Sequence, residues 1–297
     1  MTLFFIIIVL VAVIILCFYR WYEEEQYKKT EYYSQTGNSY SEINNDKGLA
    51  GEFETWEQLK SLPGYKKCLF NCYIPKRNRG TTEIDFILIH ETGIYIFESK
   101  NYGGWIYGSE NRRFWLQTLS RGRRGIQRNT FFNPVIQNKI HMKWLARYVN
   151  LKSDYFNTYV VFSSRCRFKN IDVDNERHKV VKMENLVSEI NRQIADSSNI
   201  LSETEIDALY KKLQPLTQVD EAAKFQHVQD IRENQEPVRM TEFKANLDGI
   251  RCPFCGSRLV IRYAKQGESA GSKFLGCSNY PRCRYTKEVV DDTFLKL

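Results

Sequence analysis

The chain begins with one continuous apolar run, and only after it do the hydrophobic positions become periodic. Residues 3–19, LFFIIIVLVAVIILCFY, contain no charge and no helix breaker. A bilayer core of ~30 Å needs ~20 helical residues, within a range of ~17–25, so this run is long enough to cross it. A buried helix or a cleaved signal peptide has a similar pattern. A signal peptide, however, carries basic residues before its apolar run, and here only Met1 and Thr2 precede it. The pattern favours a membrane anchor.

Charges after the run predict its orientation. Arg20, Lys28 and Lys29 follow the apolar residues and no cation precedes them, which favours a cytoplasmic body. Residues 20–46 are mostly polar and are expected to form a tether. The prediction is a single-pass protein of the cell membrane whose body lies in the cytoplasm.

Residues 47–213 show the periodicities of an α/β domain. In GLAGEFETWEQLKSL the positions of Ala50, Phe53 and Trp56 share one helical face. Apolar runs predict strands, and a helix is expected after Asn133, with Pro134 in its first turn. The expected strands are 68–74, 83–89, 94–99, 157–164 and 178–183, and the expected helices are 133–150 and 184–194. The order of these elements predicts a mixed sheet flanked by helices.

Acidic residues stand on the two central strands of this domain. In EIDFILIHETGIYIFESK, Asp85 and Glu98 lie on neighbouring strands, and Lys100 shares a sheet face with Glu98. Carboxylates of this kind hold magnesium, which polarises a phosphoryl oxygen and activates water. Lys100 would then orient the water or stabilise charge on phosphate, and Glu52 would assist from the preceding helix. The alternative is an edge ion pair worth ~0–1 kcal/mol.

The net charge of +8 is compatible with a polyanionic partner. Part of the excess lies in the segment SRGRRGIQRN, which is either a phosphate-binding loop or a solvated one. Its candidate nucleic-acid contacts are Arg121, Arg123, Arg124 and Arg128.

The eight cysteines divide into two groups. Four are scattered through apolar or irregular segments and are interpreted as idle thiols. The other four form two close pairs, which predict a tetrahedral zinc site rather than disulfides; they are Cys252, Cys255, Cys277 and Cys283. Residues 214–248 are expected to be a linker, and residues 249–297 a small β zinc ribbon.

Three motifs in the body together resemble the nuclease-related domain called NERD: GLAGEFETWEQL, EIDFILIHETGIYIFESKNYGGWIYG and FFNPVIQNKIHMKWL. That resemblance implies a restriction-endonuclease-like fold and a site that uses Mg²⁺ or Mn²⁺. It assigns metal binding to Asp85 and Glu98, and it places Glu52, Lys100 and Gln137 beside them as catalytic residues. His90 and His141 have no partner at a ligand spacing and are interpreted as structural.

The carboxyl-terminal sequences CPFCG and KFLGCSNYPRCRYT resemble the zinc ribbons of bacterial type IA DNA topoisomerases. The resemblance implies binding to DNA, chiefly to single strands, through cations and aromatic side chains. A ribbon that contacts only proteins is the alternative. The candidate contacts are Arg258, Lys273, Phe274, Tyr280 and Arg282.

The sequence as a whole therefore predicts a membrane-anchored, metal-dependent nuclease that hydrolyses phosphodiester bonds in DNA. The alternative is a membrane-anchored DNA-binding or scaffold protein that does not cut. Metal dependence distinguishes them, because binding through arginines persists without a divalent cation and weakens with salt.

Overall fold

The computed structural model describes residues 2–77, 80–122, 125–173, 178–220, 222, 224–227, 229, 251–252, 254–263 and 273–288. The chain divides into two compact units. The first contains residues 1–113 and 132–220, and the second contains residues 114–131 and 221–297.

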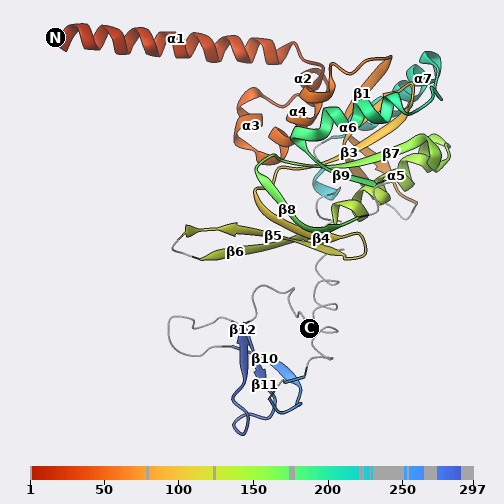
Figure 1. Ribbon diagram of the computed structural model, residues 1–297. Coiled ribbons are helices and arrows are strands. Elements are labelled where there is room, and N and C mark those ends of the chain that lie inside the picture. The colour runs from red at the N-terminus through yellow and green to blue at the C-terminus, as the bar shows by residue number, and fades with distance from the viewer. Residues whose placement is uncertain are drawn as a thin grey trace. The chain divides into compact units, whose positions relative to one another are not determined.

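A five-stranded mixed sheet forms the centre of the first unit (Figure 1). Its strands are β1 (Lys66–Pro75), β2 (Thr81–His90), β3 (Gly93–Lys100), β7 (Phe156–Phe162) and β9 (His178–Lys182), in the order β1-β2-β3-β7-β9. The first three strands are antiparallel, and β3–β7 and β7–β9 are parallel. The predicted α/β architecture is confirmed.

Helices cover both faces of this sheet because its strands bury alternate side chains on opposite sides. In β3, Tyr95 and Phe97 pack in the core beneath α4 (Lys47–Leu59) and α6 (Met183–Ala195). Ile94 and Ile96 pack on the other side, beneath α5 (Pro134–Val149) and α7 (Glu203–Leu213). Later residues of β3 therefore face one of these two helix layers or the other, according to whether their number is even or odd.

The apolar run lies in a single helix, α1 (Thr2–Lys28), which extends well beyond residue 19. It is long and apolar enough to cross a membrane, and none of its most apolar window is buried in the protein. A helix of the folded core would be mostly buried, so the structure does not support that alternative.

The prediction that residues 20–46 form a polar tether is wrong. The segment completes α1 and then forms α2 (Glu31–Thr36) and α3 (Tyr40–Asn45), capped by Thr30 and Ser39. Tyr27, Tyr32 and Ile43 are 3%, 0% and 3% exposed and belong to the core that includes Trp56 of α4. A few apolar anchors decide the packing of this segment even though most of its residues are polar.

Four strands of the body were not predicted. In the first unit β4 (Gly104–Ser109) and β8 (Cys166–Asp172) form a parallel pair. In the second, β5 (Phe114–Ser120) and β6 (Ile126–Phe132) are neighbours. A 2.8 Å hydrogen bond from the amide of Arg121 to the carbonyl of Gly125 closes the turn between them.

The described residues of the carboxyl-terminal ribbon form three antiparallel strands: β10 (Leu259–Tyr263), β11 (Lys273–Cys277) and β12 (Thr286–Glu288). Of the expected linker, Gln214–Thr217 form a short 3-10 helix, and much of the remainder lies outside the described residues.

Candidate functional site

Glu98 and Lys100 occupy the carboxyl end of β3, and Glu98 is the last of six consecutive buried residues. Glu98 continues the face of Ile94 and Ile96, so its carboxylate points toward α5 and is only 1% exposed. As the alternation predicts, Lys100 lies on the same face, and its ammonium donates to Oε1 of Glu98.

The second oxygen of Glu98 is bonded to a histidine of α5. Nε2 of His141 lies 3.1 Å from Oε2 of Glu98, and Nδ1 lies 2.8 Å from the hydroxyl of Thr82 on β2. An ionised Glu98 only accepts, so Nε2 donates to it, and Nδ1 shares a second hydrogen bond with the Thr82 hydroxyl. The sequence interpretation missed this role of His141. His90 does have a structural role, because its nitrogens contact Thr92 and the carbonyl of Pro63.

Asp85 lies on β2, one residue beyond the last registered pair of β2 and β3, which is Phe86 with Phe97. Its Oδ2 accepts the backbone N–H of Ser99 at 3.0 Å, which fixes it beside the end of β3. Burial raises the pKa of the Asp85 carboxyl well above its usual value, and the charges of Glu98 and Glu52 raise it further.

Glu52 reaches the same place from α4. The helix approaches β3 closely at Gly51, where an added Cβ would lie 2.9 Å from the Ser99 hydroxyl and 3.0 Å from Cβ of Asn101. Glycine therefore permits the contact that brings the next residue to the site. Oε2 of Glu52 is buried and has no hydrogen-bond partner among the described residues. Burial raises the pKa of Glu52 to about 8, with Glu83 and Glu98 adding to the effect.

The charges in this cluster are unbalanced. Burial alone would raise the pKa of Glu98, but the Lys100 ammonium and the bond from His141 outweigh it and lower that pKa. Burial likewise opposes the charge of Lys100, whereas Glu98 and Asp85 raise its pKa. Among the described residues Lys100 forms its ion pair with Glu98, and neither Asp85 nor Glu52 forms an ion pair.

This donor set suits a hard divalent cation. Magnesium prefers oxygen ligands and commonly takes only one or two protein carboxylates, with water and substrate completing its shell. Asp85 and Glu98 supply such oxygens, and the orphaned oxygen of Glu52 is an additional acceptor. These acids do not form a closed cage, because no three of them within the described residues gather as tightly as the ribbon cysteines do.

The structure brings Glu52, Asp85, Glu98 and Lys100 together, and it shows no described hydrogen bond between them and Gln137. Gln137 lies one turn before His141 on α5. In the part of the chain that is described, its side chain makes no hydrogen bond with Lys100 or with the acids. Its orienting role therefore stays a prediction.

The predicted basic segment is only partly described. Arg121 is exposed at the end of β5, and Arg128 is half-buried in β6. Arg123 and Arg124 lie outside the described residues.

The four ribbon cysteines meet as the spacing predicts. Their sulfurs all lie within 4.8 Å of one another, and the distances Cys252–Cys283 and Cys255–Cys277 are 3.6 and 3.4 Å. Tetrahedral zinc with Zn–S bonds of ~2.3 Å separates its sulfurs by about 3.8 Å, so the four thiols fit a structural zinc ion.

Exposed side chains surround this zinc site. Arg258, Tyr280 and Arg282 are exposed, and Phe274 is half-buried; the side chain of Lys273 lies outside the description. Arg262 stacks 5.5 Å from the centre of the Tyr280 ring. Sequence reasoning overlooked Phe254, which is 80% exposed and lies next to Tyr285.

Comparison with known proteins finds matches to two separate segments of the chain. Residues 47–163 match the family model described as nuclease-related domain, and residues 249–292 match that of the topoisomerase DNA-binding C4 zinc finger. An uncharacterized protein of Bacillus anthracis is 33% identical over 136 residues, which are 46% of this chain. The match spans 61% of that relative. The chain therefore contains a nuclease-related domain at residues 47–163 and a C4 zinc ribbon of the topoisomerase type at residues 249–292.

Proposed function

We propose that this protein is a metal-dependent nuclease that hydrolyses phosphodiester bonds in DNA and is held at a membrane by α1. One observation carries the proposal: a nuclease-related domain gathers three acids beside one lysine, and among the described residues only Glu98 forms an ion pair with that lysine. A purely structural ion pair needs neither the second nor the third carboxylate.

Asp85 and Glu98 would hold Mg²⁺ or Mn²⁺. Such a cation polarises the phosphoryl oxygen and lowers the pKa of the attacking water. His141 and Thr82 fix the second oxygen of Glu98, so that its carboxylate keeps one orientation. Glu52, whose Oε2 has no other described partner, would accept a hydrogen bond from the water.

Lys100 acts as a cation in this scheme. Glu98 and Asp85 overcome the effect of burial and raise its pKa, which keeps its ammonium protonated. A protonated lysine donates hydrogen bonds, so it positions the nucleophile or stabilises charge developing on phosphate. Gln137 would orient Lys100 or the phosphate once substrate is present.

The remaining parts would deliver the enzyme to its substrate. The apolar helix α1 would anchor it in the cell membrane with its body in the cytoplasm, in line with the cations that follow the run. The zinc ribbon would bind DNA strands through its exposed arginines and aromatic rings.

Cleavage by the full chain in detergent micelles tests the proposal. Plasmid, linear duplex, single-stranded DNA and RNA would be incubated with Mg²⁺, with Mn²⁺ or without added divalent cation. We expect metal-dependent cutting of DNA that Lys100→Ala abolishes. Lys182→Ala is the matched control, because Lys182 also pairs with a glutamate two residues away, Glu184, but at the surface.

Two results would contradict the proposal. If no substrate is cut while binding to DNA persists, the protein is a DNA-binding or scaffold protein that does not cut. If Lys182→Ala reduces cutting as much as Lys100→Ala, the effect of Lys100 is not specific to the acidic cluster.

A further inference from the structure

A row of cations on β8 has no role in the site described above. Cys166 is buried, and Phe168 turns inward to pack against Phe162, with ring centres 5.4 Å apart. The intervening positions, Arg167 and Lys169, therefore point outward, and both are exposed. In the described part of the chain no carboxylate pairs with either of them.

An exposed tryptophan belongs to the same face. Trp105 of β4 is the register partner of Arg167 and is 46% exposed. The ammonium of Lys169 lies 5.1 Å from the centre of its ring. After Phe168 the pairing of β4 and β8 shifts register, and Asn170 has a φ of 51°, so the alternation ends at Lys169.

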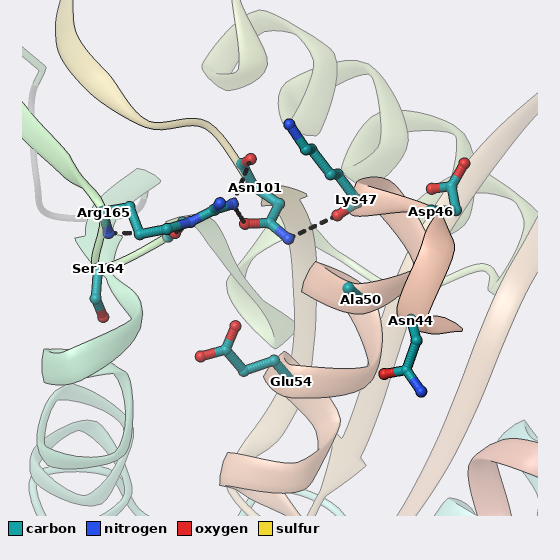
Figure 2. A pocket seen from close by; sticks show the side chains of 9 residues that line it. Asn44, Asp46, Lys47, Ala50, Glu54, Asn101, Ser164 and Arg165 are labelled. Carbon is teal, nitrogen blue, oxygen red and sulfur yellow. Dashed lines mark hydrogen bonds between the residues drawn. The ribbon is translucent and has the colours of Figure 1, made fainter. Parts of the chain in front are cut away.

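The other end of the row reaches the acidic cluster. Arg165, just before β8, donates from Nη2 to Oδ1 and to the carbonyl of Asn101, at 2.5 and 3.3 Å. Asn101 directly follows Lys100, and the amide of Ser163 donates to the Lys100 carbonyl at 3.1 Å. Figure 2 shows Arg165 extended toward Asn101, with Lys47, Ala50 and Glu54 of α4 around the same pocket. The volume of this pocket is about 430 Å³.

We propose that Arg165, Arg167, Lys169 and Trp105 form a binding track for a single strand of nucleic acid and lead that strand to Lys100. The inference rests on the proposed nuclease function and adds to it a substrate preference. Alternate residues of a strand are ~6.6 Å apart, a spacing comparable to one nucleotide step. Cations at this interval follow a phosphate backbone, and an exposed aromatic ring stacks a base, which is how single-strand grooves work. The track uses none of the residues of the ribbon or of the basic segment 121–128.

Binding by the full chain in detergent tests the track apart from catalysis. Lys100→Ala protein without added divalent cation would be titrated with labelled oligothymidine and with a labelled duplex. We expect Arg167→Ala/Lys169→Ala to weaken single-strand binding about tenfold. The slope of log K against log salt should flatten by about 1.4, since each lost single-strand contact contributes ~0.7.

The chain offers a matched control on α5. Lys143 and Arg147 both lie over the ring of Trp144, at 5.9 and 5.7 Å from its centre. Lys143→Ala/Arg147→Ala therefore removes the same number of cations beside a tryptophan and should leave binding unchanged. Trp105→Ala should weaken binding, whereas Trp105→Phe should retain most of it. Oligonucleotides carrying 5-bromouracil should crosslink under ultraviolet light to the peptide that contains Trp105.

Binding of the same variants to anionic lipid vesicles would be measured beside DNA binding. Four outcomes would overturn the track: unchanged affinity in the β8 variant, an equal loss in the α5 control, no crosslink at Trp105, or a loss of binding that affects the vesicles and not the DNA. The last would identify the face as a membrane contact. Cutting by the unsubstituted chain with Mg²⁺ is scored separately. If binding depends on the track but no DNA is cut, the proposed nuclease function is refuted and the track is not. If DNA is cut at the same rate when the track residues are replaced, the track is refuted and the nuclease function is not.

Discussion

Replacing His141 by alanine tests how much the Glu98 carboxylate depends on its support from α5. The change removes one hydrogen bond to a charged group, worth about 1.5–3 kcal/mol, and one to a hydroxyl, worth about 1 kcal/mol. The buried oxygen of Glu98 then has no fixed donor, and the carboxylate is free to rotate. We therefore expect two losses, one in the free energy of unfolding and one in metal affinity.

The metal loss can be estimated. Removing a group that orients a metal ligand typically weakens metal binding by about 10–100-fold. At a Mg²⁺ concentration of 100 times Kd, binding stabilises the unsubstituted protein by about 2.7 kcal/mol. A tenfold weaker site retains about 1.4 kcal/mol at the same concentration, and a hundredfold weaker site about 0.4 kcal/mol.

The assay is thermal unfolding with and without Mg²⁺, together with cleavage rate against Mg²⁺ concentration. His90→Ala is the control, because His90 is also buried and makes hydrogen bonds through both ring nitrogens, but to Thr92 and Pro63. Both variants should be destabilised, whereas only His141→Ala should lose the Mg²⁺-dependent stabilisation. The reasoning fails if the two variants respond to Mg²⁺ alike.

Three further predictions concern other parts of the chain. The raised pKa of Glu52, about 8, means that this group stabilises the metal-free fold below its unfolded pKa of 4.5 and that this contribution is lost as pH rises through 8. Glu52→Gln should therefore raise the melting temperature of metal-free protein above pH 8 but not near pH 4, and an equal effect at both would refute this. Cys255→Ser should remove one equivalent of zinc and the ribbon's own unfolding transition while the body melts unchanged, as calorimetry with zinc analysis would show. Deleting residues 1–45 should lower the melting temperature and increase the binding of a dye that fluoresces on exposed apolar surface, because it uncovers the aromatic residues that pack on α4. Deleting residues 1–19 leaves those residues covered and should do neither.

Local periodicity explains what the sequence could predict. Alternating apolar residues on either side of a short turn defined the hairpin of β2 and β3, and the same parity placed Lys100 beside Glu98. Two close cysteine pairs defined the zinc site, since the knuckle spacing itself brings the sulfurs together.

Long-range packing explains what the sequence could not predict. His141 contacts Glu98 and Thr82, which are 43 and 59 residues away in the sequence, because the fold packs α5 against β2 and β3. The one local sign was its place a turn after Gln137 on the same helix. Strands β4 and β8 are short and carry polar residues on one side, so neither has the apolar pattern that predicts a core strand.

The folded end of α1 determines how far the body of the protein can lie from the apolar run. Nine residues, 20 to 28, continue the helix beyond Tyr19 and span about 13 Å at 1.5 Å per residue. Tyr27 is buried in the core, so no flexible segment lies between the helix and the body. A flexible tether of the 27 residues from 20 to 46 would have an end-to-end distance of about 29 Å, at roughly 5–6 Å times the square root of the number of residues. With α1 in a bilayer as proposed, the body instead stays close to the membrane surface and meets only the nucleic acid that comes to it.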